Sequence, residues 1–121
     1  MNSKAQIDLD CQRLIATTDD GIVGTVQYGL DTHCIEIIGL DVHINYRQKG
    51  VARTLIQHIK KIGMNEKVFL LKLHTIKETG NVVVFKRLGF KVISERVDDL
   101  FESDKFEKLT DVKMIMEIPN K

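Results

Sequence analysis

The spacing of the apolar residues changes near Gly50, and this change limits the folds that the chain can adopt. Before Gly50, apolar residues recur at every second position, as in Val26, Tyr28 and Leu30, which is the period of a strand with one buried face. After it, they recur at the longer interval of a helix with one buried face, and strand patterns then return. The sequence therefore predicts an α+β, or mixed α/β, fold in which antiparallel strands come first and a strand-helix-strand crossover follows.

Three strands are predicted before the change, over residues 12–18, 22–30 and 34–44. Asp19-Asp20-Gly21 joins the first two as a tight turn, in which the glycine permits a positive φ, and Asp31-Thr32-His33 joins the next two. We expect these strands to form an antiparallel meander.

A helix is predicted from Gly50 to Ile62, with Gly63 as its C-terminal cap. Its apolar stripe consists of Val51, Leu55, Ile59 and Ile62. The next strand is expected over residues 67–75 and parallel to the strand before the helix, because a helix connects the two. Its apolar face is expected to consist of Phe69, Leu71 and Leu73.

Residues 79–88 are ambiguous, because three successive valines favour a strand whereas Gly89 is well placed to end a helix. Strands are predicted over residues 90–95 and 112–118, the latter with Val112, Met114, Met116 and Ile118 alternating. Between them, residues 95–111 carry seven acidic residues against three basic ones.

The length of 121 residues predicts one domain over residues 1–121. The net charge of +1 provides no general attraction for nucleic acid or an anionic membrane, and no segment is long and apolar enough to span a bilayer. We expect a cytoplasmic protein without nucleic-acid or membrane partners. Cys11 and Cys34 lack metal-ligand spacing, so reduced thiols and no metal site are expected.

A basic stretch surrounds the predicted start of the helix. No acidic residue occurs between Asp41 and Glu66, and five basic ones do: Arg47, Lys49, Arg53, Lys60 and Lys61. A helix N-terminus opened by a glycine is a favourable site for a phosphate group. The alternative is a solvated basic helix face after an ordinary turn.

Two motifs narrow this choice. Arg47-Gln48-Lys49-Gly50-Val51-Ala52 fits the pattern Q/R-x-x-G-x-G/A between a strand and a helix, and Phe85-Lys86-Arg87-Leu88-Gly89-Phe90 follows the next strand. With these motifs the chain resembles the GNAT superfamily of acyl-CoA-dependent N-acyltransferases over residues 12–118. The resemblance implies that residues 79–88 form a helix and that residues 1–121 are an acetyltransferase-like domain.

The resemblance also implies a binding site for acetyl-CoA. The pyrophosphate would bind the backbone amides of Gln48, Lys49, Gly50, Val51 and Ala52, helped by Arg53. Leu40 and Val42 would pair through their backbones with the pantetheine arm, as an added strand does. Arg47, Lys49 and Lys86 would reach the remaining phosphates, and Phe85 is included among the cofactor contacts.

Acyl transfer to an amine needs a group that accepts a proton from the ammonium form. Glu36 is the first candidate, because some family members carry a glutamate base on this strand and its apolar neighbours would raise the pKa of its carboxyl. The alternative is an exposed glutamate without a role. His43 is the second candidate and, with Asp41, is expected on the face opposite Glu36. His58 and His74 have no acidic partner in the sequence nearby and are expected to be structural.

The family commonly protonates the leaving thiolate with a tyrosine, where this chain has Phe85, and an expected asparagine is replaced by about Glu78. Tyr46, next to the predicted phosphate-binding residues 47–53, is the more plausible substitute for the acid. The family usually has an N-terminal strand and two helices that form one wall of the acceptor groove, and only about ten residues precede the first strand here. We therefore expect an open acceptor site or a second subunit, in a possible homodimer, that supplies the wall.

The resulting prediction is an N-acetyltransferase that uses acetyl-CoA and acts by direct transfer in a ternary complex. The alternative is a catalytically weak or inactive coenzyme A-binding module, and a nucleic-acid-binding domain is a weaker third. The acceptor would be a small-molecule or protein amine. The net negative charge of segment 95–111 would favour a cationic amine, unless this segment is only a solvated connection between the last two strands.

Overall fold

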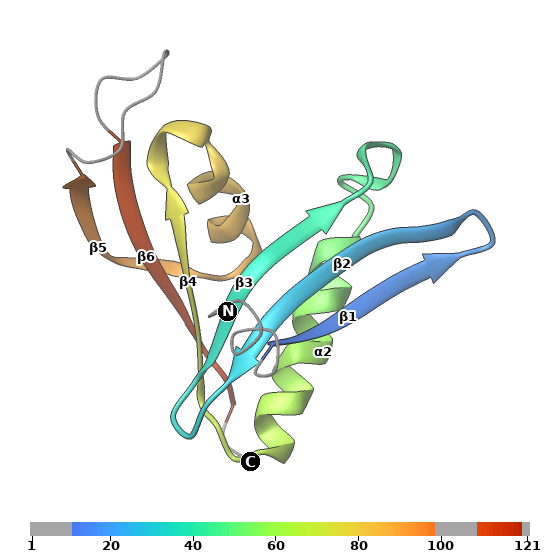
Figure 1. Ribbon diagram of the computed structural model, residues 1–121, viewed down its shortest axis with the longest axis horizontal. Coiled ribbons are helices and arrows are strands. Elements are labelled where there is room, and N and C mark those ends of the chain that lie inside the picture. Colours follow the sequence, from blue (N-terminus) through green and yellow to red (C-terminus); the bar gives the residue numbers. More distant parts are fainter. Residues whose placement is uncertain (1–10, 99–108, 120–121) are drawn as a thin grey trace, which may run out of the picture. The chain divides into compact units, whose positions relative to one another are not determined.

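The computed structural model describes residues 11–98 and 109–119. In them, six strands form a mixed sheet in the order β1-β2-β3-β4-β6-β5, together with two α-helices and two short 3-10 helices (Figure 1). This is the α+β architecture that the sequence predicts. The described residues form two compact units, which are treated separately: unit 1 contains residues 11–71 and 117–119, and unit 2 contains residues 72–98 and 109–116. None of the helices in these residues is long and apolar enough to cross a membrane.

Unit 1 begins with the predicted antiparallel meander of β1 (Cys11–Thr18), β2 (Gly21–Leu30) and β3 (Ile35–Val42). The expected strand 34–44 is wrong at its end, because the chain leaves the sheet after Val42 and forms the 3-10 helix η1 (Ile44–Tyr46). His43 caps the short helix that follows. Its ring Nδ1 accepts a hydrogen bond from the Asn45 amide at 3.1 Å and so caps η1.

A bulge in β3 changes which side chains share a face. Ile37 pairs with Tyr28 and Gly39 with Gln27, so Ile38 has no partner in β2. Directly paired residues point to the same side of a sheet. Glu36 and Asp41 therefore share one face, whereas simple alternation predicted opposite faces for them. That prediction was wrong because the extra residue reverses the alternation.

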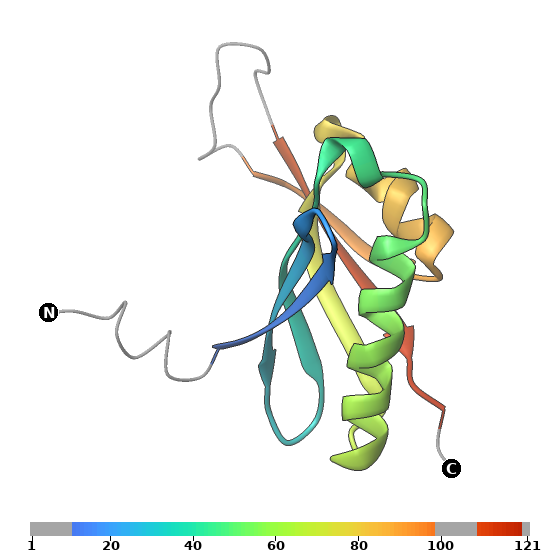
Figure 2. The same ribbon diagram turned by 90° about the vertical axis from the view of Figure 1, so that its right-hand side faces the viewer.

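Helix α2 (Val51–Asn65) covers the other face of β1, β2 and β3 (Figure 2). Leu55, Ile56 and Ile59 of this helix are buried. The helix begins close to β2, because Gly24 has no side chain: a Cβ there would lie 2.7 Å from Val51 Cγ1. Gly24 thus fixes how near the N-terminus of α2 approaches the sheet.

Gly63 is not the predicted helix cap. It lies inside α2 and is buried, and the helix ends at Asn65 with Glu66 as the cap, whose amide donates to the Ile62 carbonyl at 2.9 Å. A Cβ at Gly63 would lie 2.5 Å from Ile118 Cδ1, so this glycine admits the chain segment that follows the last strand. The role of Gly63 is therefore to allow close packing of Ile118 against α2, not to cap the helix.

Strand β4 (Leu70–Ile76) runs from unit 1 into unit 2. Leu71 and Leu73 are buried as predicted. Phe69 does not join their face, since it precedes the strand and is 44 % exposed. The turn after α2 places Lys67 at a positive φ of 61°, and the Phe69 carbonyl accepts a hydrogen bond from the Ile118 amide at 2.8 Å.

The remaining elements of unit 2 are η2 (Lys77–Thr79), α3 (Asn81–Leu88), β5 (Lys91–Asp98) and β6 (Leu109–Glu117). The ambiguous residues 79–88 are thus mainly helical, as the family resemblance implied, and Gly89 ends α3 at a φ of 111°. β5 and β6 are antiparallel. Val112, Met114, Met116 and Ile118 are all buried, which confirms the predicted alternation. Most of the acidic stretch proposed beside an acceptor site, residues 99–108, lies outside the described residues.

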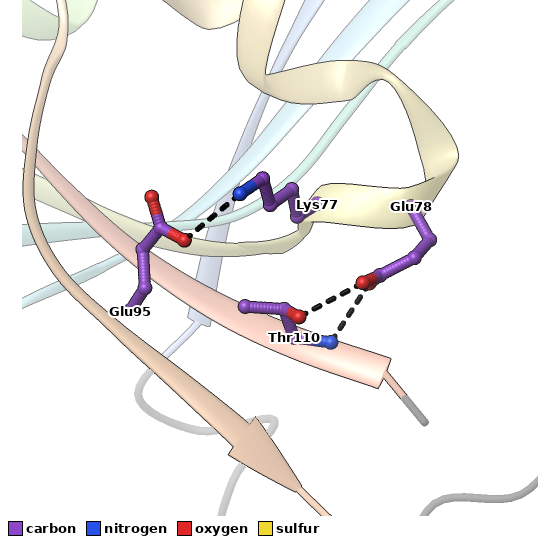
Figure 3. A network of polar contacts seen from close by, with 4 residues as sticks. All are labelled: Lys77, Glu78, Glu95 and Thr110. Carbon is purple, nitrogen blue, oxygen red and sulfur yellow. Dashed lines mark hydrogen bonds and ion pairs between the residues drawn. The ribbon is translucent and has the colours of Figure 1, made fainter. Parts of the chain in front are cut away.

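Glu78 ties η2 to the start of β6 (Figure 3). Its carboxylate accepts hydrogen bonds from the Thr110 amide and the Thr110 hydroxyl, each at 2.8 Å. Lys77 and Glu95 form an ion pair of 3.2 Å beside it. The backbone hydrogen bond from Thr110, aided by the hydroxyl, lowers the pKa of Glu78 below that of an ordinary glutamate.

Replacing Glu78 with glutamine is expected to lower the melting temperature at neutral pH and to have little effect in acid. Because the pKa of Glu78 is lower in the folded protein, its contribution is present above the unfolded-state pKa of about 4.3 and disappears as the pH falls through the folded-state value. Thermal unfolding from pH 7 to pH 3 measures this. Glu117→Gln, an exposed glutamate of β6, is the control. A constant difference between Glu78→Gln and the parent across this range would contradict the prediction.

Candidate functional site

The loop between β3 and α2, residues 43–50, is held by hydrogen bonds within unit 1. The His43 amide donates to the Val23 carbonyl at 2.8 Å, which fastens the loop to β2. The Arg47 Nε donates to the Val42 carbonyl at 3.0 Å, which ties the loop to the end of β3. These two hydrogen bonds fix the loop to β2 and to β3 before the chain enters α2.

The loop ends in an open helix N-terminus. Gly50 has a φ of 87° and no side chain caps the helix there, while a Cβ on Gly50 would meet no atom within 4 Å. The first helical hydrogen bond runs from the Thr54 amide to the Gly50 carbonyl, so the amides of the first turn have no acceptor within the helix. The helix dipole adds partial positive charge at the same place. This geometry suits a phosphate group.

Basic side chains accompany the open N-terminus. Arg47, Lys49 and Arg53 are exposed, and the first turn of α2 contains no acidic residue. The residues predicted to bind phosphate occupy residues 47–50 of the loop and the first turn of α2. Leu40 and Val42 precede it as half-buried residues at the end of β3.

A cleft of about 520 Å³ lies beside this loop, within unit 1. It is bounded by the β1–β2 turn on one side and by the loop on the other. Its lining consists of Asp20, Ile22, Val23, His43, Asn45, Tyr46 and Lys49.

Tyr46, the predicted substitute for the catalytic acid, is at the centre of the loop's side-chain contacts. Its hydroxyl donates a hydrogen bond to the carboxylate of Asp20 on the β1–β2 turn. Lys49 Nζ lies 5.9 Å from the centre of the Tyr46 ring, and the His43 ring meets it edge-on at 6.0 Å. The proton of the hydroxyl is therefore directed to Asp20.

His43 has the geometry of a cap. Because its Nδ1 accepts the Asn45 amide hydrogen, the neutral ring carries its own hydrogen on Nε2. The lone pair that a general base needs is already engaged.

Glu36 lies away from the loop. It is the second residue of β3, half-buried, and pairs with Gly29. It is six positions before Val42, about 20 Å along an extended strand. The structure thus places Glu36 and the loop at opposite ends of β3.

Phe85 and Lys86, the two other predicted cofactor residues, lie on α3 in unit 2. Phe85 is half-buried and packs edge-on against Phe90, with 5.9 Å between ring centres. Lys86 is exposed. Their roles stay predictions.

The structure also shows an imidazole with an acidic partner, which the sequence did not reveal. His74 has no acidic partner near it in the sequence, but in the structure its Nδ1 on β4 lies 3.0 Å from Asp111 Oδ2 on β6. The two residues are far apart in sequence and come together through strand pairing. A carboxylate at Nδ1 fixes the ring and leaves Nε2 to accept a proton, which is a recurrent arrangement of catalytic histidines. No group of three or more metal-ligating side chains occurs in residues 11–98 and 109–119.

Comparison with known proteins addresses the family and the fold of the chain. The family model described as the acetyltransferase (GNAT) family matches residues 2–90. No curated protein sequence matches the chain significantly.

Solved structures share the fold at low sequence identity. A nourseothricin acetyltransferase is 20 % identical with a TM-score of 0.77, over 93 % of this chain and 68 % of that one. The ribosomal-protein-S18-alanine N-acetyltransferase from Escherichia coli is 14 % identical with a TM-score of 0.78, over 100 % and 79 %. A GNAT family acetyltransferase from Elizabethkingia anophelis, solved with acetyl-CoA bound, is 17 % identical with a TM-score of 0.77, over 95 % and 81 %.

Proposed function

The chain belongs to the acetyltransferase (GNAT) family, and from that premise we propose that it transfers an acetyl group from acetyl-CoA to a primary amine by direct attack in a ternary complex. The observation that carries the proposal is the open N-terminus of α2. It combines uncapped first-turn amides, a glycine that leaves space, and neighbouring basic side chains. The amides and the basic side chains favour a pyrophosphate over a neutral ligand, and the glycine leaves room for it.

The residues of the loop fit coenzyme A. The amides of the first turn of α2 would hold the pyrophosphate, and Arg47, Lys49 and Arg53 would neutralise phosphate charge. The backbones of Leu40 and Val42 would hold the pantetheine arm. When bound, acetyl-CoA supplies an acetyl group activated as a thioester.

A covalent intermediate on Cys34 is disfavoured by its position. The side chain is only 6 % exposed, and its Sγ lies 3.7 Å from Asp31 Oδ2, so its hydrogen is directed to a carboxylate. Burial against a negative charge disfavours a reactive thiolate. Direct transfer, with the acceptor amine as the nucleophile, fits these surroundings better.

The test of the proposed function has two stages. Calorimetric titration with acetyl-CoA measures binding, and a thiol-release assay on a panel of neutral and cationic amines, with mass spectrometry of the products, measures transfer. Binding together with an acetylated amine supports the proposal. Binding without thiol release on any amine would instead support a coenzyme A-binding module, which the absence of a hydroxyl at Phe85 favours. No binding would reject both.

We propose Glu36 as the group that accepts the proton of the amine, and Glu36→Gln is expected to lower turnover by about 100-fold, the lower end of the range for a positioned base. The glutamine cannot accept the proton, so the dependence of turnover on pH should flatten. Affinity for coenzyme A should stay within about threefold, because Glu36 lies at the far end of β3 from the loop. Steady-state kinetics across pH values, with titration of coenzyme A, measure both effects.

Asp41→Asn is the matched control, because it removes a carboxylate from the same face of β3 nearer the loop. Its turnover is expected to resemble that of the parent. If Glu36→Gln keeps the parent's pH profile, Glu36 is not the proton acceptor. His74→Gln is then the next variant to measure, since Asp111 already orients that imidazole.

A further inference from the structure

The contact between Tyr46 and Asp20 joins the phosphate loop, residues 43–50, to the turn between β1 and β2. Tyr46 belongs to η1 in the phosphate loop, and Asp20 belongs to the turn between β1 and β2. The Asp20 amide donates to the Thr18 hydroxyl at 3.1 Å, so the turn that carries the carboxylate is itself fixed. Tyr46 is the only half-buried residue among positions 43–50, and the other seven are exposed. The hydroxyl bond to Asp20 therefore anchors the loop to the β1–β2 turn, while the bond from Arg47 Nε to the Val42 carbonyl ties it to the end of β3.

The negative charge of Asp20 is unfavourable for binding of the phosphates of coenzyme A. A carboxylate beside a phosphate-binding loop repels the phosphate and offsets the attraction of a nearby cation such as Lys49, which lines the same cleft. A residue at this place whose only effect was electrostatic would weaken binding. Its hydrogen bond to Tyr46 offers a reason for its presence that charge does not.

We propose that Asp20 is a positioning residue that holds the phosphate loop in its binding conformation through the hydroxyl of Tyr46. The loop contains two residues at positive φ, Gln48 at 62° and Gly50 at 87°. Gln48 is not a glycine, so this conformation costs free energy and needs support from its surroundings. The support comes from the backbone bond between His43 and Val23, from the Arg47 side chain at the Val42 carbonyl, and from the bond between Tyr46 and Asp20. That the loop binds coenzyme A rests on the proposed function.

The two substitutions of Asp20 separate position from charge. Asp20→Ala removes the hydrogen-bond acceptor and the charge, and it is expected to weaken coenzyme A binding by about tenfold, the value of one hydrogen bond to a charged group. Asp20→Asn keeps an acceptor for the hydroxyl and removes only the charge, so its affinity is expected to equal or exceed that of the parent. If charge alone mattered, both variants would bind more tightly, and that result would overturn the proposal.

Tyr46→Phe tests the other end of the contact. It keeps the ring that meets His43 and Lys49 and removes only the hydroxyl, so its loss of affinity should match that of Asp20→Ala. The double variant Asp20→Ala with Tyr46→Phe should bind no more weakly than either single variant, because both remove the same bond. Additive losses would contradict a shared bond. Asp19→Ala, which removes the neighbouring carboxylate of the same turn, is the control and should not weaken binding.

The ligand-free protein gives a second test that does not depend on coenzyme A. Hydrogen exchange of the amides of residues 47–52 should accelerate in Asp20→Ala and in Tyr46→Phe, and should stay at the parental rate in Asp20→Asn and Asp19→Ala. The chain has two tyrosines and no tryptophan, so in a Tyr28→Phe background its fluorescence reports Tyr46 alone. Loss of the carboxylate partner in Asp20→Ala should raise that emission.

The two proposals fail differently. A parent protein that does not bind coenzyme A would reject the proposed function, while unchanged exchange and emission in Asp20→Ala would reject the anchor. Parental exchange in Asp20→Ala and Tyr46→Phe, in a protein that binds coenzyme A normally, would leave the proposed function intact and overturn this inference alone.

Discussion

Replacing Gly50 with glutamate is expected to reduce coenzyme A affinity by more than about 100-fold in a protein that still folds. The substitution places a carboxylate where the phosphate is expected, and a side chain in a space that is empty. It also forces a residue with a Cβ to a φ of 87°, which costs about 1 to 2 kcal/mol. The fold should survive, because no atom lies within 4 Å of the new Cβ and an acidic residue favours a helix N-terminus. Calorimetric titration and circular dichroism measure the two properties.

Two controls accompany Gly50→Glu. Gly50→Ala imposes the same backbone strain without the charge, so its loss of affinity should be smaller. Gly80→Glu makes the same substitution at the N-terminus of α3, where the glycine has a φ of 85° and equally open surroundings. Its affinity is expected to remain within about threefold of the parent. Normal binding by a folded Gly50→Glu protein would exclude this loop as the phosphate site.

Replacing Gly63 with leucine is expected to cost about 3 kcal/mol of unfolding free energy or more, at the upper end for overpacked cores. The first added atom would already lie 2.5 Å from Ile118 Cδ1 and 3.3 Å from the Val68 carbonyl oxygen. Leucine is a good helix former, so loss of helix propensity cannot explain the effect. Urea denaturation measures it.

A smaller pair of substitutions identifies the clash itself. Gly63→Ala should destabilise the protein, and adding Ile118→Val, which removes only the Cδ1 methyl group, should restore part of the loss. Gly39→Ala is the control, because a Cβ at Gly39 meets nothing within 4 Å. Equal stability of Gly63→Leu and the parent would mean that Ile118 does not pack against this helix.

The parts of the protein that the sequence predicted correctly depend on residues close together in the chain. The start of α2 is one example, since the helix begins at Val51, directly after the glycine at which the sequence predicted its start. The alternating residues of β6 are another, because burial follows directly from their spacing.

The contacts that the sequence did not predict join distant residues. Asp20 and Tyr46 are 26 positions apart, and His74 and Asp111 are 37 apart. Strand pairing brings each pair together, and no local pattern marks which acid meets which partner. The prediction that Gly63 caps the helix was wrong for another reason, since a glycine near a helix end is consistent with both a cap and a close contact. Only the position of Ile118 distinguishes the two.

The extra residue at Ile38 has a practical consequence for anyone who redesigns this strand or aligns it with others. A count by twos from Glu36 selects Ile38, Leu40 and Val42 as its companions, although the pairing with β2 places Leu40 and Val42 on the side of α2. An engineer who wishes to extend a surface from Glu36 toward the loop must therefore alter Gly39 and Asp41. An alignment that omits one residue here would transfer side chains from every relative to the wrong side of the sheet, from Gly39 as far as Val42.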